Sequence, residues 1–595
     1  MFARLNDYLK NHIYVAGASL ALVAAAVYSG VLSNGLVYDD GKQLLENPFV
    51  RNPHLWRRIF SGSVWSFLGA AAENNFYRPL HIFSYWLIWR VAGPNPAVYH
   101  LFQWLLYIAT GLVVFQIGRG VLKNDLAAFA GSLLWLLHPL HVEAVAWIAS
   151  VPEMGCGFFY LVGFWLFIRA ERSRTRHLAR HALAALAYFP ALFFKEAALS
   201  FPLLLIAYWF FFARDGQTWS RRVACWSIYA GAVLAYSLVR VAALGHFSGV
   251  GHLWKVSPQI VAAAVGLLGQ HARLFFWPLH LNVFHSFDPG SSLRSFWPWL
   301  ALLGLLAACA LRKHQPALGF LVVWWAVTLM PCLDVRQLSF PLLAERFSYL
   351  PSVGLCLALA GFGLEWLPQR LLRARWSPVV LPALGLVLYF WGIQDVRAIP
   401  NWRSNETLFG YSLRVAPNAG LVRIHHGLDL QYREHDLEGA RKEFEAALRL
   451  NLAGFQPLNT VTYDALIGLG QVADLKGRHD EALACYQKAT RVLPYHSLAY
   501  DILGAVYFPR AEYSKAAYYF VRSVQVNPQD MTARFYLGAS WMKLGRYREA
   551  AEQFHAAREV DPAYWQAYCA EAQALEAAGD AAGAAAVRKL KLAAE

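Results

Sequence analysis

Long apolar runs recur through the first two thirds of this chain. Between about residue 13 and residue 394 they follow one another at short intervals, and most can cross the ~30 Å hydrocarbon core of a bilayer with their flanks. A soluble globule is excluded, since 57% of the residues are hydrophobic and only 15% are charged, against about 25% in soluble domains. We predict eleven spans, at residues 13–33, 98–118, 126–138, 145–168, 182–195, 199–213, 223–243, 296–311, 317–331, 352–367 and 378–394.

Two of the apolar segments need separate treatment. The first run is long and no convincing processing site follows it, so we interpret it as an uncleaved anchor. The segment 257–290 mixes His, Arg and Gln with apolar residues and is too polar for a clear span. We expect it to lie on the outer membrane surface as an amphipathic segment.

The formal net charge of +15 is explained by where Lys and Arg lie. With the N-terminus inside, they concentrate in alternate short loops, which is the cytoplasmic bias of membrane proteins and argues against a nucleic-acid partner. An odd number of spans then puts everything after residue 395 on the outer face. The outer loops hold mainly Lys195, Arg336 and Arg346, whereas the inner loops hold Arg119, Lys123, Arg169, Arg172, Arg174, Arg176, Arg180, Arg214, Arg221, Arg222, Arg312, Lys313, Arg370, Arg373 and Arg375.

The last 200 residues repeat with a period of 34. Small residues, rings and prolines keep one phase, which is the tetratricopeptide pattern of paired helices that pack closely and end at proline. The matching positions are Gly470, Gly504 and Gly538; Ala482, Ala516 and Ala550; Tyr486, Phe520 and Phe554; and Pro494, Pro528 and Pro562. Gly427, Ala440 and Phe444 predict a fourth repeat, which an insertion at 451–460 separates from the other three. Phe409 and Pro417 predict a half repeat before it, and we expect a capping helix at 581–592.

The chain therefore divides into a membrane domain, residues 1–395, and a repeat domain, residues 396–595. Repeat superhelices use their concave surface mainly for binding, so capture of a protein or peptide is expected there. The alternative is a structural spacer or an oligomerisation arm. The seven Cys show no spacing typical of a disulfide framework or a zinc site.

Polar residues gather at the outer ends of the predicted spans. Asp39 and Asp40 directly follow the first span, and paired carboxylates there suggest a bound cation, a general base or a hydroxyl acceptor rather than only a solvated turn. Arg78, beside aromatic residues, is a candidate phosphate ligand or an arginine that snorkels to the interface. Lys195, next to Glu196, is a weaker phosphate ligand or half of an adjacent ion pair.

The second outer loop places two imidazoles and a carboxylate within six residues. His138, His141 and Glu143 are metal-ligand and acid/base types, but their spacing matches no fixed zinc signature. Metal binding, contact with a phosphate or sugar, and local structure all remain open. Glu153, two to three turns into the next predicted span, either faces the same cavity or caps buried groups.

Glu345 and Arg346 precede a late span, and Arg346 is a second candidate phosphate ligand. Together these residues predict a site at the outer mouth of the bundle. A lipid-linked, phosphate-bearing substrate could enter it sideways from the bilayer.

With these motifs in place, the chain resembles the transmembrane and tetratricopeptide-repeat-containing O-mannosyltransferases, which have the GT-C glycosyltransferase fold. The similarity covers nearly the whole length. It departs at Val151-Pro152-Glu153, where that family tends to have a basic residue and then Asp, and the repeats are few. The matching motifs are Asp39-Asp40, Tyr77–Leu80, His138–Ala144, Lys195-Glu196, Phe276–Leu279, Glu345–Ser352 and Asn401–Phe409.

The resemblance implies an all-α GT-C bundle and an inverting transfer of a sugar from a polyprenyl phosphate to a hydroxyl of an extracytoplasmic protein. Asp39 or Asp40 would be the base. The cations Arg78, Arg346 and Lys195 would hold the donor phosphate, while the remaining acids and histidines shape the donor site or bind a divalent cation.

The last residues carry no ER-retention address, so a bacterial inner membrane with periplasmic repeats is expected. Two rival functions stay open. One is the same fold acting on a lipid or polysaccharide, and the other is a non-enzymatic, membrane-anchored repeat scaffold for envelope assembly.

Overall fold

The computed structural model describes residues 2–68, 76–173, 177–212, 219–245, 257–285, 287–334, 342–367, 377–433, 435–450, 456–528, 530–560 and 564–594. These residues form helices and connecting loops, without a β-strand among them. Contacts divide the chain into two units. One spans Met1–Val64 and Asn75–Pro417, and the other contains Trp65–Asn74 and Asn418–Glu595. The predicted all-α architecture, with a membrane bundle and a repeat stack, is confirmed.

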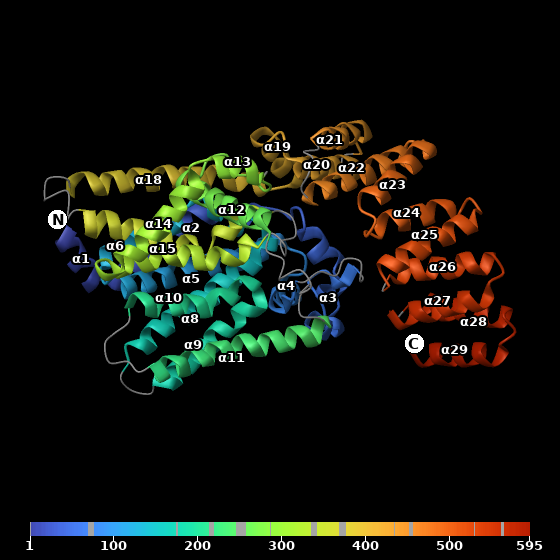
Figure 1. Cartoon of the computed structure of the whole chain (residues 1–595), viewed down its shortest axis with the longest axis horizontal. Helices are drawn as coiled ribbons and strands as arrows, with labels where there is room; N and C mark the ends of the chain where they lie inside the picture. The colour runs from blue at the N-terminus through green and yellow to red at the C-terminus, as the bar shows by residue number, and fades with distance from the viewer. Residues whose placement is uncertain are drawn as a thin grey trace. The chain divides into compact units, whose positions relative to one another are not determined.

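The first unit is a bundle of helices of unequal length (Figure 1). The long helix α5 is central to it, because α2, α6 and α8 all pack against α5. The helices are α1 (Phe2–Asn11), α2 (Ile13–Tyr28), α3 (Pro48–Arg51), α4 (Pro79–Ala92), α5 (Pro96–Leu122), α6 (Asp125–Leu136), α7 (Val142–Ala146), α8 (Val151–Glu171), α9 (His177–Phe194), α10 (Phe201–Phe212), α11 (Trp219–Leu244), α12 (Pro258–Phe276), α13 (Pro289–Arg294), α14 (Trp297–Ala310), α15 (Pro316–Leu329), α16 (Ser352–Gly361), α18 (Ser377–Ala398) and α19 (Asn405–Val415).

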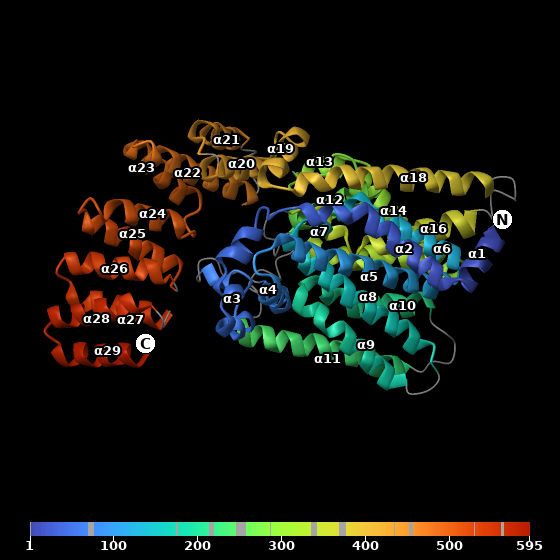
Figure 2. The same ribbon diagram turned by 180° about the vertical axis from the view of Figure 1, so that it is seen from behind.

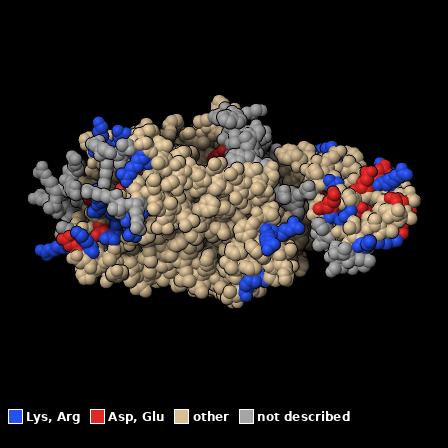
Figure 3. Space-filling view, turned by 90° about the horizontal axis from the view of Figure 1, so that it is seen from below, with Lys and Arg blue, Asp and Glu red and all other residues tan. Residues whose placement is uncertain are grey.

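Seven helices in the described part of the chain are long and apolar enough to cross a membrane, or eight if the bent pair Asp125–Leu136 and Pro139–Ala146 is one span. The face of the bundle in Figure 3 carries a broad belt without charged residues, and Lys and Arg lie at both ends of the belt. Some of the basic residues from which the membrane orientation was predicted lie outside the described residues. They are Arg174, Arg176, Arg214, Arg336, Arg370, Arg373 and Arg375. The chain is a multi-pass membrane protein. The seven are Ile13–Ser33, Pro96–Leu122, Ile148–Glu171, Trp219–Leu244, Pro258–Phe276, Pro316–Leu333 and Val379–Trp402.

Four of the predicted spans are helical but are shorter or less apolar than the seven helices that can cross a membrane. Three of them correspond to α10, α14 and α16, which have 12, 14 and 10 residues. The fourth, α9, has 18 residues but begins with a polar stretch that contains His177, Arg180 and His181. These polar residues precede the predicted span, residues 182–195, which by itself is short for a membrane-spanning helix.

The prediction that segment 257–290 is too polar for a span was wrong for its first half. Residues Pro258–Phe276 form one 19-residue helix, α12, that is apolar enough to cross a membrane. Its polar residues do not interrupt it, because His271 is buried and bonds Ser348 Oγ at 2.9 Å. Tertiary contacts satisfy groups that looked exposed in the sequence.

The helices α8 and α9 approach each other closely where Gly163 faces Tyr188. A Cβ on Gly163 would lie 2.7 Å from the Tyr188 Cβ, closer than packed carbons can come. Small residues at such positions let membrane helices pack backbone to backbone. The pair matters because α8 carries Glu153 in its first turn and Lys195 directly follows α9.

The second unit is a stack of antiparallel helix pairs (Figure 2). Gly504 faces the Phe520 ring and Gly538 faces the Phe554 ring, so that a Cβ would lie 2.7 or 2.8 Å from a ring carbon. The same contact joins Gly427 to Phe444, as the predicted fourth repeat requires. Pro562 and residues 451–455 of the predicted insertion lie outside the described residues, and residues 456–460 are the start of α22. The helices are α20 (Gly420–Tyr432), α21 (Leu437–Arg449), α22 (Gln456–Leu475), α23 (His479–Val492), α24 (Leu498–Tyr507), α25 (Tyr513–Val526), α26 (Met531–Lys543), α27 (Tyr547–Val560), α28 (Trp565–Ala577) and α29 (Ala581–Ala594).

Candidate functional site

The loop after α2 presents the two acids in a constrained turn. Tyr38 has φ of 51°, a left-handed conformation that costs a bulky residue free energy. It is held there because its N–H donates to Asn405 Oδ1 at 2.8 Å and its ring contacts the rings of Trp147 and Phe284, with centroids 5.5 Å away in both cases. These contacts hold the backbone directly before Asp39 and Asp40.

Asp40 is buried and fully engaged by the protein. Its Oδ2 accepts the Val37 N–H at 2.9 Å, and its Oδ1 accepts the Ala149 N–H at 2.8 Å. Burial raises the pKa of Asp40 well above its usual value, although both backbone N–H groups act in the opposite direction. This carboxyl group joins the first loop to the turn before α8.

Asp39 is half-buried, and among the described residues its carboxylate has no hydrogen-bond partner. Burial raises the pKa of Asp39 to about 6, while Lys42 and Arg346 act to lower it. The group is thus ionised near neutral pH and available to take a proton. Adjacent acids in the sequence have different environments in the fold.

Arg346 lies at the centre of an ion cluster. Its backbone N–H donates to Glu143 Oε2 at 2.8 Å, its guanidinium pairs with Glu143 Oε1, and its Nε lies 3.3 Å from Glu153 Oε1. The guanidinium carbon also lies 4.9 Å from the Trp147 ring centroid and 5.1 Å from that of Phe347. A cation fixed on several sides in this way is preorganised to bind an anion.

Glu153 joins a second cation to this cluster. Lys195 Nζ donates to Glu153 Oε1 at 2.7 Å and lies 4.7 Å from the Phe347 ring centroid. Glu153 lies in the first turn of α8, not two to three turns into a span as predicted from the sequence. Lys195 precedes the short helix Glu196–Ser200, and its partner is Glu153 rather than the adjacent Glu196.

Arg78 forms a separate pair with Glu196. Its Nε and one terminal nitrogen donate to Glu196 Oε2 at 3.0 and 2.8 Å, and the guanidinium carbon lies 4.4 Å from the Phe76 ring centroid. The three predicted phosphate ligands are thus each paired with a glutamate. An incoming phosphate would compete with or share those carboxylates.

A small cavity lies within the ion cluster. Its volume of about 20 Å³ holds about one water molecule and not a phosphate group. Its lining includes Glu153, Lys195 and Arg346 together with Cys156 and Cys332. A phosphate group could therefore reach these cations only from another side or by displacing side chains.

His138 and His141 are fully buried behind this cluster, and the protein uses all four of their ring nitrogens. His138 Nε2 donates to the Phe275 carbonyl at 3.1 Å, and its Nδ1 accepts a backbone N–H at 3.3 Å. His141 bonds the Tyr107 hydroxyl at 3.0 Å and Ser352 Oγ at 2.9 Å. Of the predicted site residues, Asp39 is the one whose carboxylate makes no hydrogen bond or ion pair with the described part of the protein.

Glu345 lies apart from the Arg346 cluster, at a larger cavity. Its Oε1 accepts the Asn282 N–H at 2.6 Å and the His285 Nε2–H at 2.8 Å. Burial raises the pKa of Glu345 well above its usual value and lowers the pKa of His285 to about 4. The contact between His285 and Glu345 was not foreseen from the sequence.

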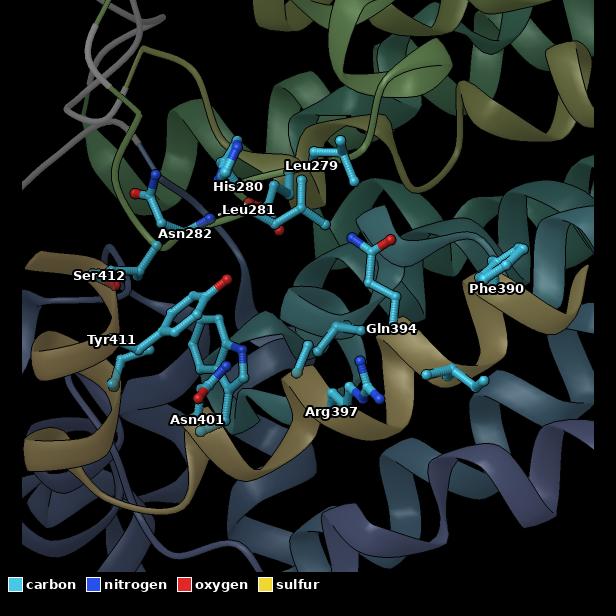
Figure 4. Close-up of a pocket in the computed structure, with 17 residues that line it drawn as sticks. Leu279, His280, Leu281, Asn282, Phe390, Gln394, Arg397, Asn401, Tyr411 and Ser412 are labelled. Carbon is cyan, nitrogen blue, oxygen red and sulfur yellow. Dashed lines mark hydrogen bonds between the residues drawn. The ribbon is translucent and has the colours of Figure 1, made fainter. Parts of the chain in front are cut away.

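The cavity beside Glu345 has a volume of about 440 Å³, within the range of ligand pockets (Figure 4). Polar groups from the end of α18, from α19 and from the loop after α12 line it. Only Glu345 was predicted, although Phe276–Leu279 and Asn401–Phe409 were noted as motifs. Its other polar lining residues are His280, Asn282, Gln394, Arg397, Asn401, Tyr411 and Ser412.

Fold and site together define a multi-pass membrane protein with a buried ion cluster and tetratricopeptide repeats. The tetratricopeptide repeat family matches residues 428–496 and 541–590. The homologues of this chain are protein O-mannosyl-transferases, as the resemblance predicted. F38B6.6 of Caenorhabditis elegans is 22% identical, over 73% of this chain and 62% of its own length. Tmtc1 of Drosophila melanogaster is 24% identical, over 75% of this chain and 62% of its own length.

Human TMTC3, also a protein O-mannosyl-transferase, is 22% identical over 79% of this chain and 54% of its own. The chain spans less than two thirds of the length of these relatives. Among solved structures, the tetratricopeptide-repeat protein YrrB is 23% identical and aligns with 31% of this chain and 92% of its own, with a TM-score of 0.27.

Proposed function

We propose that this chain is a membrane glycosyltransferase that moves a sugar, mannose in the first instance, from a polyprenyl phosphate to a hydroxyl of an extracytoplasmic protein. The observation that carries the proposal is the half-buried Asp39, an unpaired carboxylate with a raised pKa that feels the charge of Arg346. A general base works best when its pKa lies near the working pH. Mannose is chosen because the relatives are named protein O-mannosyl-transferases.

Asp39 is the base in this mechanism, and Asp40 is a positioning residue. The Asp39 carboxylate takes the proton of the acceptor hydroxyl while the hydroxyl oxygen attacks the anomeric carbon from the face opposite the phosphate. The bond between that carbon and the phosphate oxygen breaks, and polyprenyl phosphate leaves with the electron pair. Asp40 cannot act similarly in this geometry, because both oxygens accept backbone N–H groups.

Arg346 and Lys195 stabilise the departing phosphate. Glu143 and Glu153 hold these cations in place, which keeps them oriented before the donor arrives. Preorganised charge stabilises a transition state more than mobile charge does, because no reorganisation is needed during the reaction. Arg78, which pairs with Glu196 and not with the carboxylates around Arg346, makes a secondary contact with the phosphate.

The site faces the extracytoplasmic side, which in a bacterial inner membrane is the periplasm. The placement of basic loop residues supports this orientation. The lipid tail of the donor remains in the bilayer, and the repeats of the second unit hold the polypeptide acceptor. The cavity next to Glu345 supplies polar groups and room for a sugar or acceptor segment.

The experiment is transfer in a defined system. The full chain in lipid nanodiscs is mixed with polyprenyl-phosphate [³H]mannose and extracytoplasmic proteins from the same cells. We expect labelled protein with wild type and none above background with Asp39→Asn. Glu46→Gln, a change in the helix after the acids, is the matched control and should transfer normally. Label that appears in lipid or polysaccharide instead would overturn the protein acceptor, and equal labelling by Asp39→Asn would overturn the base.

A further inference from the structure

A second polar cluster lies at the opposite end of α8 from the proposed active site. It contains Glu171, the last residue of α8, with His177 and His181 of α9 and Cys225 of α11. Glu153 and Glu171 are 18 residues apart on one helix, which at 1.5 Å per residue separates them by about 27 Å. The cluster therefore takes no part in sugar transfer.

The four side chains lie close together, with His177 between His181 and Cys225. His181 Nε2 lies 3.2 Å from Glu171 Oε1 and 3.3 Å from His177 Nε2, and Cys225 Sγ lies 3.4 Å from His177 Nδ1. One ligand atom from each histidine and the cysteine sulfur all lie within 4.8 Å of one another. The histidines are four residues apart on α9, so they project from the same helix face.

The cluster is buried and one of its rings is already oriented. His181 is fully buried and Cys225 is 1% exposed. The Tyr229 hydroxyl bonds His181 Nδ1 at 3.0 Å, which fixes the ring and turns Nε2 toward the cluster. A histidine that binds a metal commonly has its other ring nitrogen held by such an outer partner.

We infer that His177, His181, Cys225 and Glu171 bind a zinc-class divalent cation. Zinc bonds of about 2.0–2.3 Å in tetrahedral geometry place ligand atoms roughly 3.3–3.8 Å apart. One nitrogen of His177 binds the ion, and the ligand atoms of the two histidines and the cysteine, which lie within 4.8 Å of one another, close in around it. A thiolate and a carboxylate balance the two positive charges, and the thiol proton passes to solvent when the ion binds. Arg221, whose Nε lies 3.4 Å from His177 Nδ1, opposes the ion, so both anionic ligands are needed.

The ion would connect three helices that also build the active site. Figures 1 and 2 show α9 beside α8 and α11. At their other ends, α8 carries Glu153, Lys195 follows α9, and Tyr236 of α11 donates to the carbonyl of Tyr77, next to Arg78. The metal site is therefore structural, and it stabilises the frame that holds the phosphate-binding cations.

Metal analysis of the full-length protein tests the inference. Wild type in nanodiscs is stripped with a chelator, incubated with zinc, dialysed and analysed by mass spectrometry. We expect about one zinc per chain, a higher thermal unfolding temperature with zinc, and at least a fivefold lower zinc content in His181→Ala and Cys225→Ser. Cys309→Ser and His12→Gln, which change exposed residues outside the cluster, are the matched controls and should retain zinc.

Cobalt separates loss of a ligand from loss of the fold. Wild type with cobalt should show tetrahedral d–d bands and a thiolate-to-cobalt charge-transfer band in the near ultraviolet. Cys225→Ser, which is nearly isosteric, should lose the charge-transfer band, and Tyr229→Phe should keep it because Tyr229 supplies no ligand. A wild type that retains no zinc and shows no such band, or variants that bind as much zinc as wild type, would overturn the inference.

Discussion

Asp39 and Asp40 are neighbours in the sequence, yet their surroundings separate their chemistry. Two backbone N–H groups occupy Asp40, whereas Asp39 has its charge near Arg346 and an unpaired carboxylate in the described structure. The sequence left open which of them is the base. The difference comes from their contacts, because the fold brings the Ala149 N–H to Asp40 and leaves Asp39 near Lys42 and Arg346.

Replacing each acid separately should give different defects. Asp39→Asn should lower kcat by about 10²–10⁴-fold, the usual contribution of a general base, with unchanged thermal stability. Asp40→Asn should instead lower stability, because an amide NH₂ would face a backbone N–H that its carboxylate oxygen now accepts. Transfer rates and unfolding temperatures of both variants decide this, and the reverse pattern would exchange the two roles.

The pH dependence of transfer should follow the pKa of Asp39. The base must be deprotonated, so kcat/KM should rise with pH through about 6 and reach a plateau above it. Activity that rises only below pH 5, or falls across this range, would exclude Asp39 as the base. The residual activity of Asp39→Asn should lack this rise.

Arg346 should tolerate loss of its shape better than loss of its charge. Arg346→Lys keeps a cation near Glu143 and Glu153 but cannot reproduce the planar fork, so donor KM should rise about tenfold or more in a folded protein. Arg346→Ala leaves buried carboxylates unpaired and should unfold more easily. Donor saturation curves and thermal unfolding report the two effects, and an unchanged donor KM in Arg346→Lys would make this arginine structural.

At the scale of elements, the packing of α8 on α9 determines where Glu153 and Lys195 meet. Gly163→Ala would put a methyl group 2.7 Å from the Tyr188 Cβ, and overpacking of this kind costs about 1–3 kcal/mol. We expect a lower unfolding temperature and reduced transfer. Gly231→Ala on α11 is the matched control, because a Cβ there meets no atom within 4 Å. Equal stability of the two variants would contradict the close α8 and α9 contact.

At the scale of the whole molecule, the two units should divide the work. Ending the chain after Pro417, where the contacts separate the units, retains α19 with the bundle. Donor hydrolysis and transfer to a short hydroxyl-bearing peptide should survive, while transfer to full-length protein should fall about tenfold or more, because the lost repeats lower the effective concentration of acceptor. Undiminished protein transfer would favour the scaffold role of the repeats, and loss of donor hydrolysis would show that the units are not independent.

Periodic features were predictable from the sequence because each depends on residues close along the chain. The apolar runs predict membrane helices, and the 34-residue period predicts the contacts of Gly504 with Phe520 and of Gly538 with Phe554. Prediction of membrane helices from apolar runs failed where a helix also contains polar residues whose hydrogen bonds are made by tertiary contacts. It missed the helix Pro258–Phe276 and counted the short helices α10, α14 and α16 as full spans.

The sequence by itself determined the fold class, the repeat stack and most of the residue types at the proposed site. Only the tertiary structure decided how those residues pair: Lys195 with Glu153, Glu196 with Arg78, and Asp40 with the backbone of Ala149. The metal-binding cluster was likewise hidden, because Cys225 lies far along the chain from His181. Hydrophobic periodicity is a local property, whereas a pKa, an ion pair or a metal site depends on which distant helix ends the packing brings within a few ångströms.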